Sequence, residues 1–368
     1  VKTFYSTSKN AASIALEFKN QVADFRAELI LFFVSSNLDV AAINNELNKT
    51  FKETKICGCT TSGEIVSGKM LDNAFVAMAF GKDLIADMAI ELVDLNDGKE
   101  GIKRAFENFG SHFKNPMASL DPEKYVGIVL IDGMSGAEEM VNDKIGDLTN
   151  ITFIGGSAGD DLKFKETKVF YEGKIFDNAA LLMVLKPTVP FSILKTQSFK
   201  STGKVLKVTR SDEKQRKIYE FNGKPARKAY AEALNIAPEK LEEYLFKNPV
   251  GLMFNDEPFV RSPRVMDGDS IYFYCSVKDG MELHLLSSTN IVEDTKNALK
   301  KKKEEMGNIG SIINFNCILR TLDLKQQQAT QAYADLFKEL PTVGFSTYGE
   351  SYIGHINQTA TMLVFGKS

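Results

Sequence analysis

The 368-residue sequence has only four cysteines and three histidines, and these low counts exclude several classes of protein. Four cysteines are too few for a disulfide scaffold in a chain of this length. Cys57 and Cys59 are too closely spaced for a Cys-x-x-Cys redox pair, and no Cys or His stands nearby in the sequence to complete a zinc site. We therefore interpret both as small residues at a strand end and expect no bound metal.

The sequence also lacks a strong charge of either sign and a long hydrophobic run. A net charge of -3, with Lys and Arg spread throughout, gives no reason to expect nucleic acid as a partner. The basic run from Lys300 to Lys303 is followed at once by Glu304 and Glu305, which is typical of a solvated helix face. No apolar run approaches the roughly 20 residues that span a bilayer, and the amino terminus lacks a secretory signal. We expect a cytoplasmic protein without a membrane partner.

What the sequence does contain is a short pattern that occurs three times. A small hydroxylated residue is followed by any residue, by Gly and by an acid, at residues 61–64, 157–160 and 347–350. Each copy follows a short apolar segment. Each is followed by a second apolar segment opened by Asn, at Asn73, Asn178 and Asn357. This recurrence indicates one supersecondary unit used three times.

The order of elements around each copy predicts an α/β fold with mixed sheets. Residues 29–34 are continuously apolar, as in a strand buried on both faces, and residues 40–52 have helical spacing. Strand, helix and strand joined by short connections imply parallel neighbours with a right-handed crossover, and the last apolar segment is expected to return antiparallel. The same order recurs at 125–185 and 311–365, where we predict the helix at 326–340.

Two prolines, Pro187 and Pro190, mark a change of organisation, so we predict two domains, 1–190 and 191–368. Both would be built from strand-helix-strand-turn-strand units. The second domain would carry a β-rich insertion, because alternating apolar and polar runs at 192–286 are separated by turn signals. We also expect the ligand site in this second domain.

The acids that end the three motifs, Glu64, Asp160 and Glu350, stand at equivalent places in the sequence and are candidates for paired acid and base chemistry. No His or nucleophile stands in matching positions, and acids are common in turns because they bond nearby amides. The glycines lack the spacing of a nucleotide-binding loop, and tight turns explain them. We therefore do not expect an enzyme.

Arg320 ends a predicted buried strand, just after Cys317. A buried Arg needs a partner, because an uncompensated charge costs several kcal/mol. Glu350 or a bound carboxylate would suit its two-pronged guanidinium, and the two readings stay open. Arg261 is a second cation of the same kind. His355 differs from the other histidines because it lies between two motif elements, where it is a candidate haem ligand or a structural residue.

Taken together, these segments resemble the FIST sensory proteins, named for F-box and intracellular signal transduction. The amino-terminal half resembles the FIST N domain and the carboxy-terminal half the FIST C domain. The matching segments are residues 58–64, 154–160 and 176–180 in the first half, and 219–226, 315–320, 344–350 and 355–359 in the second. Ile318 and Leu319 depart from the smaller residues expected before the Arg.

The resemblance implies a cytoplasmic, bacterial small-ligand sensor that binds an amino acid or similar carboxylate. Such proteins accompany histidine kinases, cyclic-dinucleotide enzymes or chemotaxis components, and nothing beyond residues 1–368 supplies an output module here, so we expect a separate protein partner. We expect a carboxylate or similar anion to bind Arg320 and Arg261, with the remaining predicted ligand residues Cys317, Tyr348, Glu350 and Asn357. The alternatives are haem-dependent nitric-oxide sensing through His355, and a hydrolase with Cys317 as nucleophile. We otherwise expect no cofactor.

Overall fold

The computed structural model describes residues 1–367, which form two compact units. Among these residues, the first unit comprises 1–195, 295–355 and 360–367, and the second comprises 196–294 and 356–359. These units cross the predicted boundary at residue 190, because the third copy of the repeat packs with the first two. The second unit is an insertion within the third copy.

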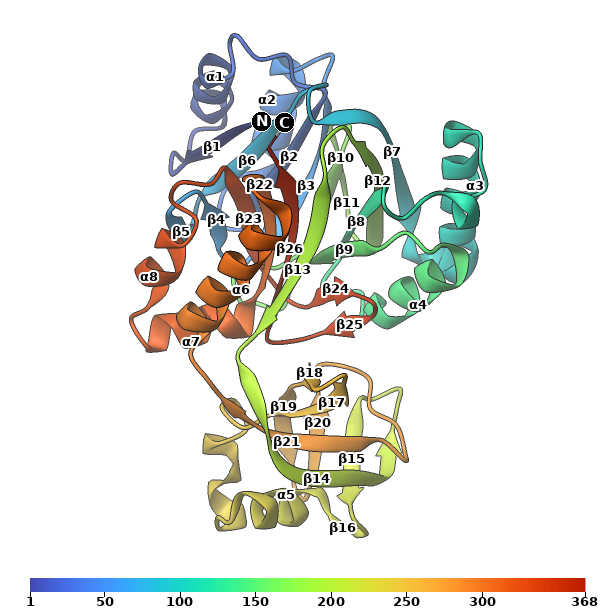
Figure 1. Ribbon diagram of the computed structural model, residues 1–368, viewed down its shortest axis with the longest axis vertical. Coiled ribbons are helices and arrows are strands. Elements are labelled where there is room, and N and C mark those ends of the chain that lie inside the picture. The colour runs from blue at the N-terminus through green and yellow to red at the C-terminus, as the bar shows by residue number, and fades with distance from the viewer. Residues whose placement is uncertain (368) are drawn as a thin grey trace. The chain divides into compact units, whose positions relative to one another are not determined.

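The first two repeats have the same order of elements, and in both a strand and a helix precede the predicted unit (Figure 1). Repeat 1 contains β1 (Lys2–Ser6), α1 (Ala11–Gln21), β2 (Leu29–Ser35), α2 (Val40–Thr50), β3 (Lys55–Thr61), β4 (Glu64–Val66), β5 (Lys69–Leu71) and β6 (Phe75–Phe80). Repeat 2 contains β7 (Ile85–Asp94), α3 (Gly98–Phe113), β8 (Val126–Ile131), α4 (Glu138–Leu148), β9 (Phe153–Ser157), β10 (Val169–Tyr171), β11 (Lys174–Phe176) and β12 (Ala179–Pro187). Side-chain caps define the helix starts: Asn10 accepts from the Ser13 amide, and Asp39 from the Ala42 amide.

Repeat 3 has the same order with two additions: the second unit is inserted after its first strand, and an extra helix, α8, follows α7. It contains β13 (Phe191–Gln197), α6 (Ile291–Met306), β22 (Ile309–Cys317), α7 (Ile318–Gln326), α8 (Thr330–Asp335), β23 (Thr342–Thr347), β24 (Glu350–Tyr352), β25 (His355–Ile356) and β26 (Thr359–Gly366). The predicted helix at 326–340 is confirmed only in part: α8 lies within that range, but a helix that was not predicted, α7, precedes it. The chain turns helical directly after Cys317, so the apolar pair Ile318 and Leu319 opens a helix rather than extending the strand.

The three repeats form three six-stranded sheets across the described residues, and their strand orders correspond one to one. The orders are β1-β6-β2-β3-β10-β11, β7-β12-β8-β9-β24-β25 and β13-β26-β22-β23-β4-β5. The predicted parallel neighbours are confirmed in β2 with β3, β8 with β9 and β22 with β23. The returning strands β6, β12 and β26 are antiparallel, as predicted, and each pairs with the first strand of its parallel pair.

The hairpin of each repeat pairs with the sheet of another repeat. The pairing is cyclic: repeat 1 extends repeat 3, repeat 3 extends repeat 2, and repeat 2 extends repeat 1. The hairpin β4–β5 of repeat 1 extends the sheet of repeat 3 through β23. The hairpin β24–β25 of repeat 3 extends the sheet of repeat 2 through β9. The hairpin β10–β11 of repeat 2 extends the sheet of repeat 1 through β3. Each motif turn therefore lies where two repeats meet.

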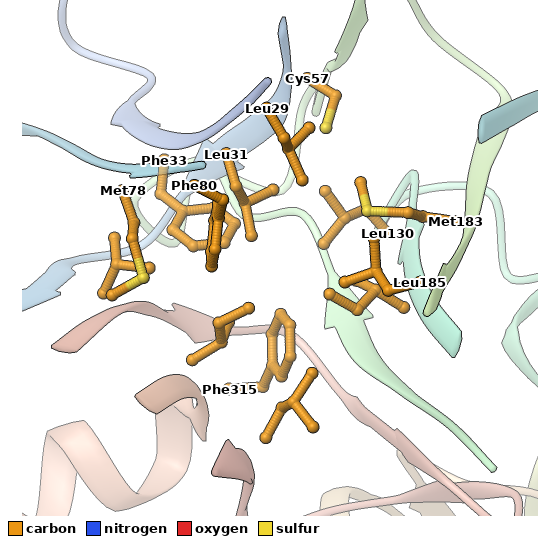
Figure 2. Close-up of a cluster of buried hydrophobic side chains, with 14 of the residues drawn as sticks. Leu29, Leu31, Phe33, Cys57, Met78, Phe80, Leu130, Met183, Leu185 and Phe315 are labelled. Carbon is orange, nitrogen blue, oxygen red and sulfur yellow. The ribbon is translucent and has the colours of Figure 1, made fainter. Parts of the chain in front are cut away.

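A shared hydrophobic core holds the three sheets together. Figure 2 shows side chains from all three repeats converging, among them Phe33, Leu130 and Phe315, which are fully buried. The outer faces of the first two sheets are covered by helices, α1 and α2 in repeat 1 and α3 and α4 in repeat 2 (Figure 1). Because both faces of these sheets are buried, their central strands are apolar without alternation.

Three glycines explain how the parallel strands approach one another. Gly58, Gly155 and Gly344 occupy the same register position, and a Cβ added to any of them would lie about 2 Å from a carbonyl oxygen of the neighbouring strand. Real Cβ atoms do not come that close, so any side chain at these positions would push the pair apart. This shared requirement is independent support for a threefold repeat.

The second unit holds an eight-stranded sheet and one short helix. Its elements are β14 (Phe199–Asp212), β15 (Lys217–Phe221), β16 (Lys224–Pro225), α5 (Ala226–Leu234), β17 (Val250–Phe254), β18 (Glu257–Arg261), β19 (Pro263–Asp267), β20 (Ser270–Phe273) and β21 (Glu282–Ser288). Its core is separate from that of the repeats and includes Val208, Phe221 and Tyr230. The predicted β-rich insertion is therefore present as a compact unit of its own. No helix in residues 1–367 is long and apolar enough to cross a membrane.

Candidate functional site

A polar pocket of about 360 Å³ lies where the hairpin of repeat 1 meets the sheet and helices of repeat 3. We call it the corner pocket. Its lining comes from β4, the β5 end, α7, α8 and β23, namely Glu64, Met70, Leu71, Asp72, Thr321, Lys325, Thr330 and Ser346. All of these residues belong to the first compact unit. Five or more polar side chains around a small hollow can bind a small polar molecule.

Glu64 is the buried acid of this pocket. Its side chain is 1% exposed, accepts a short hydrogen bond from the Thr61 hydroxyl, and accepts another from the Ala74 amide at 2.9 Å. Burial raises the pKa of Glu64 to about 8, although these two hydrogen bonds act in the opposite direction. The carboxyl group is therefore mostly protonated at neutral pH and can donate as well as accept.

An ion pair at the mouth of the pocket provides its charges. Lys325 Nζ lies 2.8 and 2.9 Å from the two carboxylate oxygens of Asp72. The two side chains are 44% and 54% exposed, so a ligand can reach both. An exposed ion pair contributes little to stability, which leaves its partners available for exchange with a ligand.

A buried hydrogen-bond network joins the pocket to Arg320. The hydroxyls of Thr321 and Ser346, both in the lining, are 2.7 Å apart. Asn316 donates to the Thr321 hydroxyl at 2.9 Å and accepts from Arg320 Nε at 3.0 Å. Arg320 also donates to the Thr295 hydroxyl on α6 at 3.0 Å. Buried polar groups linked in this way fix one another's positions.

The position predicted for Arg320 needs a correction. Arg320 lies in the first turn of α7, not at the end of a strand, because β22 stops at Cys317. Its side chain is 2% exposed, and its guanidinium lies 5.9 Å from the centre of the Tyr333 ring. Arg320 is not part of the corner-pocket lining, but it directly precedes Thr321, which is. Binding of a carboxylate by Arg320 stays a prediction.

The second motif is not part of the corner pocket. The loop that follows it encloses the carboxylate of its acid, Asp160. The Asp160 carboxylate accepts from the amides of Phe164 at 2.9 Å, Lys165 at 2.7 Å and Glu166 at 3.1 Å. The Tyr348 hydroxyl donates a short hydrogen bond to Asp160 and accepts from the Leu162 amide at 2.8 Å. Burial alone would raise the pKa of Asp160, but these hydrogen bonds lower it below its usual value.

The predicted equivalence of the three acids is therefore wrong for the second repeat. Strand pairing aligns Glu64 with Glu350, which face Phe345 and Gly156 in matching register. The residue at this position in repeat 2 is Val169, which faces Cys59. An extended loop, 160–168, separates the end of β9 from β10, and Asp160 organises that loop. The same comparison aligns Gln358, rather than Asn357, with Asn73 and Asn178. All three residues have a left-handed backbone conformation.

Three further predicted residues lie in the first unit, away from the pocket lining. Glu350 is fully buried on β24, and Cys317 is 1% exposed at the start of α7. His355 is 5% exposed, and a Cβ on Gly349 would lie 2.1 Å from its ring. This close packing favours a structural role for the imidazole. Haem binding through His355 stays a prediction.

Arg261 and Asn357 belong to the second unit. Asn357 is 1% exposed, and its side-chain oxygen accepts from the Cys275 thiol at 2.7 Å. Next to it, Gln358 donates to the Ser262 hydroxyl at 3.0 Å. Arg261 ends β18 and pairs through its backbone with Val250. Both predicted residues thus take part in the architecture of this unit, and their role in ligand binding stays a prediction.

The sequence analysis missed most of the corner pocket. Asp72, Thr321 and Lys325 stand in no motif, and they meet Glu64 only because the hairpin of repeat 1 crosses to repeat 3. One signal was available: Ser346 directly precedes the third motif. Its register partner in the parallel pair is Asn316, one of three polar residues in the buried strand β22.

Comparison with known proteins places the chain in a family. The FIST N domain matches residues 28–224, and the FIST C domain matches residues 226–352. These ranges cover most of the 368 residues, so the chain belongs to the FIST family. These two matches confirm the predicted resemblance, and FIST domains are associated with signal-transduction sensing.

Two individual proteins are also similar. The uncharacterized protein MJ1623 of Methanocaldococcus jannaschii is 24% identical over 357 residues, which cover 90% of this chain and 67% of that protein. A crystal structure of a cyanuric acid hydrolase from A. caulinodans matches with a TM-score of 0.39 and 9% identity, over 100% of this chain and 99% of that one. A structural similarity of this size carries no argument about function.

Proposed function

We propose that this chain is a sensor that binds a small zwitterion of the amino-acid class in the corner pocket. One observation carries the proposal: an accessible Lys–Asp pair borders a hollow that is also lined by a buried acid and three hydroxyl side chains. An amino acid presents a carboxylate and an ammonium group a few ångströms apart, so it can pair with Lys325 and Asp72 at once. The ligand carboxylate then replaces Asp72 as the partner of Lys325, and the ligand ammonium group replaces Lys325 as the partner of Asp72.

The remaining lining residues fit the same ligand. The hydroxyls of Thr321 and Ser346 share one hydrogen bond, so one of the two hydrogens is left to donate to the ligand carboxylate, and Glu64 can accept from an ammonium group or donate to an oxygen. A volume of about 360 Å³ is at the small end of ligand pockets, which favours a single amino acid over a nucleotide. Arg320 would hold the hydroxyl pair in place through Asn316.

We propose further that the protein signals without catalysis, in the cytoplasm, through a separate protein such as a histidine kinase, a cyclic-dinucleotide enzyme or a chemotaxis component. The association of FIST domains with sensing supports this reading. The link from Thr321 through Asn316 and Arg320 to Thr295 gives the pocket a route to α6. A ligand that displaces the Thr321 side chain would alter the hydrogen bonds that link it to Thr295, near the start of this helix.

The test is a thermal-shift screen with a panel of the standard amino acids. A ligand that binds the folded state raises stability by about 2.7 kcal/mol at a hundred times its Kd. Lys325→Met and Asp72→Asn should each abolish this increase. The control is Lys124→Met, which removes a different exposed pair, Lys124 with Asp121, and should keep the full response. Unchanged stabilisation in both pocket variants, or no stabilising amino acid, would contradict the proposal.

A further inference from the structure

A second hollow, of about 720 Å³, lies at the other end of the parallel pair of repeat 3. The corner pocket adjoins the end of β23, whereas this hollow adjoins the start of β22 at Ile309 and Pro341 just before β23. The wall is completed by α6 and by the segment after α8. The lining residues are Lys296, Leu299, Lys300, Lys303, Asn308, Ile309, Gly310, Leu336, Glu339, Leu340, Pro341 and Lys367.

The interior of this hollow is apolar. Leu299 and Ile309 are 8% and 7% exposed, and Leu336, Leu340 and Pro341 are half-buried. These five side chains come from α6, β22 and the segment after α8, so they enclose a continuous apolar surface. A fully polar ligand would leave this surface unused, whereas an alkyl chain would bury it at a gain of about 0.8 kcal/mol per methylene group.

The rim of the hollow is cationic. Lys296, Lys300 and Lys303 stand at helical spacing on one face of α6, and all three are exposed. The amide of Lys367 donates to the Asn308 carbonyl at 2.9 Å, which holds a fourth lysine at the rim. Glu339 is the one carboxylate in this lining. Lys300 approaches Glu304 only to 4.0 Å, with both side chains well exposed, so this contact neutralises little charge.

We propose that this hollow, the lysine-rimmed pocket, binds an amphiphilic anion such as a free medium-chain fatty acid. The alkyl chain would lie against Leu299, Ile309 and Leu336, and the carboxylate would face the lysines. The charge of the rim selects against cationic amphiphiles, and the apolar interior selects against small polar anions. The basic run from Lys300 to Lys303 thus contributes to a binding site. This pocket does not depend on the proposed amino-acid site.

The first experiment measures decanoate binding to the full chain by calorimetry, below the concentration at which decanoate aggregates. Lys300→Glu and Lys303→Glu should each weaken binding about tenfold or more, which is the effect expected from reversing one close charge. The matched control is Lys301→Glu, which makes the same change on the same helix at a residue outside the lining. It should change the Kd by less than about twofold, within the range of a distant exposed charge.

Further probes separate the contribution of the ligand's alkyl chain to binding from that of its charge. Octanoate, two methylene groups shorter, should bind about tenfold more weakly than decanoate. Leu336→Trp, which fills the hollow, should abolish binding while thermal unfolding shows a folded protein. Decyltrimethylammonium should not bind.

Three outcomes would overturn the proposal. One is equal decanoate binding by Lys300→Glu, Lys303→Glu and Lys301→Glu. Another is equal binding of the cationic and anionic decyl probes. The third is binding to anionic phospholipid vesicles with none to decanoate, which would assign the lysines to a membrane surface instead.

Discussion

Glu64 and Asp160 end the same short motif, yet the fold gives them opposite properties. Glu64 lies in a strand at the corner pocket with two hydrogen-bond donors, and burial raises its pKa to about 8. Asp160 opens a loop that wraps around its carboxylate with three backbone amides, and the Tyr348 hydroxyl adds a fourth donor. Its pKa is lowered. Burial outweighs the two hydrogen bonds at Glu64, whereas the four hydrogen bonds outweigh burial at Asp160.

The difference separates two roles that the motif alone cannot distinguish. An ionised acid enclosed by its own loop is satisfied and stabilises that loop. A neutral acid at the edge of a hollow keeps hydrogen-bonding capacity for a ligand. We therefore assign Asp160 to architecture and Glu64 to the candidate site, and the following predictions test that assignment.

The largest effect should be the pH dependence that Glu64 gives to the free energy of unfolding. Its pKa rises from 4.5 when unfolded to about 8 when folded, so the folded state binds more protons between these values. Stability from this group is full below pH 4.5 and is lost as pH rises towards 8, at about 1.4 kcal/mol per pH unit. Glu64→Gln should remove this slope. Urea unfolding of both proteins at pH 5 to 8 measures it, and parallel curves would contradict a neutral buried Glu64.

The next largest effect should follow Asp160→Ala. This change leaves the amides of Phe164, Lys165 and Glu166 without their acceptor, at a cost of about 2 to 3 kcal/mol in the free energy of unfolding at pH 7. The wild-type contribution is present above the unfolded pKa and is lost as pH falls through the lowered folded pKa. The variant should therefore lose less stability on acidification.

The control for Asp160 is its neighbour. Asp161 accepts from the hydroxyls of Ser35 and Ser36, both at 2.9 Å, rather than from the three loop amides that Asp160 binds. Asp161→Ala should cost about 1 kcal/mol. If the two alanine variants are equally stable at pH 7, the loop amides are not held by Asp160 in the way that the structure indicates.

The smallest effect should be that of Tyr348→Phe. The change removes the hydroxyl that donates to Asp160 and accepts from the Leu162 amide, but it keeps the stacking on Phe164 at 5.0 Å. We expect a loss of about 1 kcal/mol, because the loop amides still satisfy Asp160. Urea unfolding at pH 7 measures it. A loss as large as that of Asp160→Ala would make Tyr348, rather than the loop, the main partner of the acid.

Much of the fold could be predicted from local patterns. Apolar runs such as 29–34 predicted the buried strands, and the order of strand, helix and strand predicted parallel pairs that the structure confirms. The strand β7 was missed because six of its ten residues are exposed or only partly buried, which weakens the apolar signal. The helix after β22 was misplaced because Ile318 and Leu319 extend the apolar run of the strand.

The candidate site was harder to predict because its residues are distant in sequence. Lys325 and Asp72 are 253 positions apart, and no spacing rule connects them. The predicted ligand residues came instead from the third motif and its surroundings. The third repeat contributes Thr321, Lys325, Thr330 and Ser346 to the pocket lining, and of these only Thr321 directly adjoins a predicted residue, Arg320.

The sequence by itself determined that one unit is used three times, because periodic apolar segments and strand-end glycines are local requirements of buried parallel strands. Only the tertiary structure decided which repeat each hairpin joins, since a hairpin can extend any sheet that offers it a free edge. That choice brings Glu64 to α7 and encloses Asp160 in its own loop, and so it sets the charge of both acids.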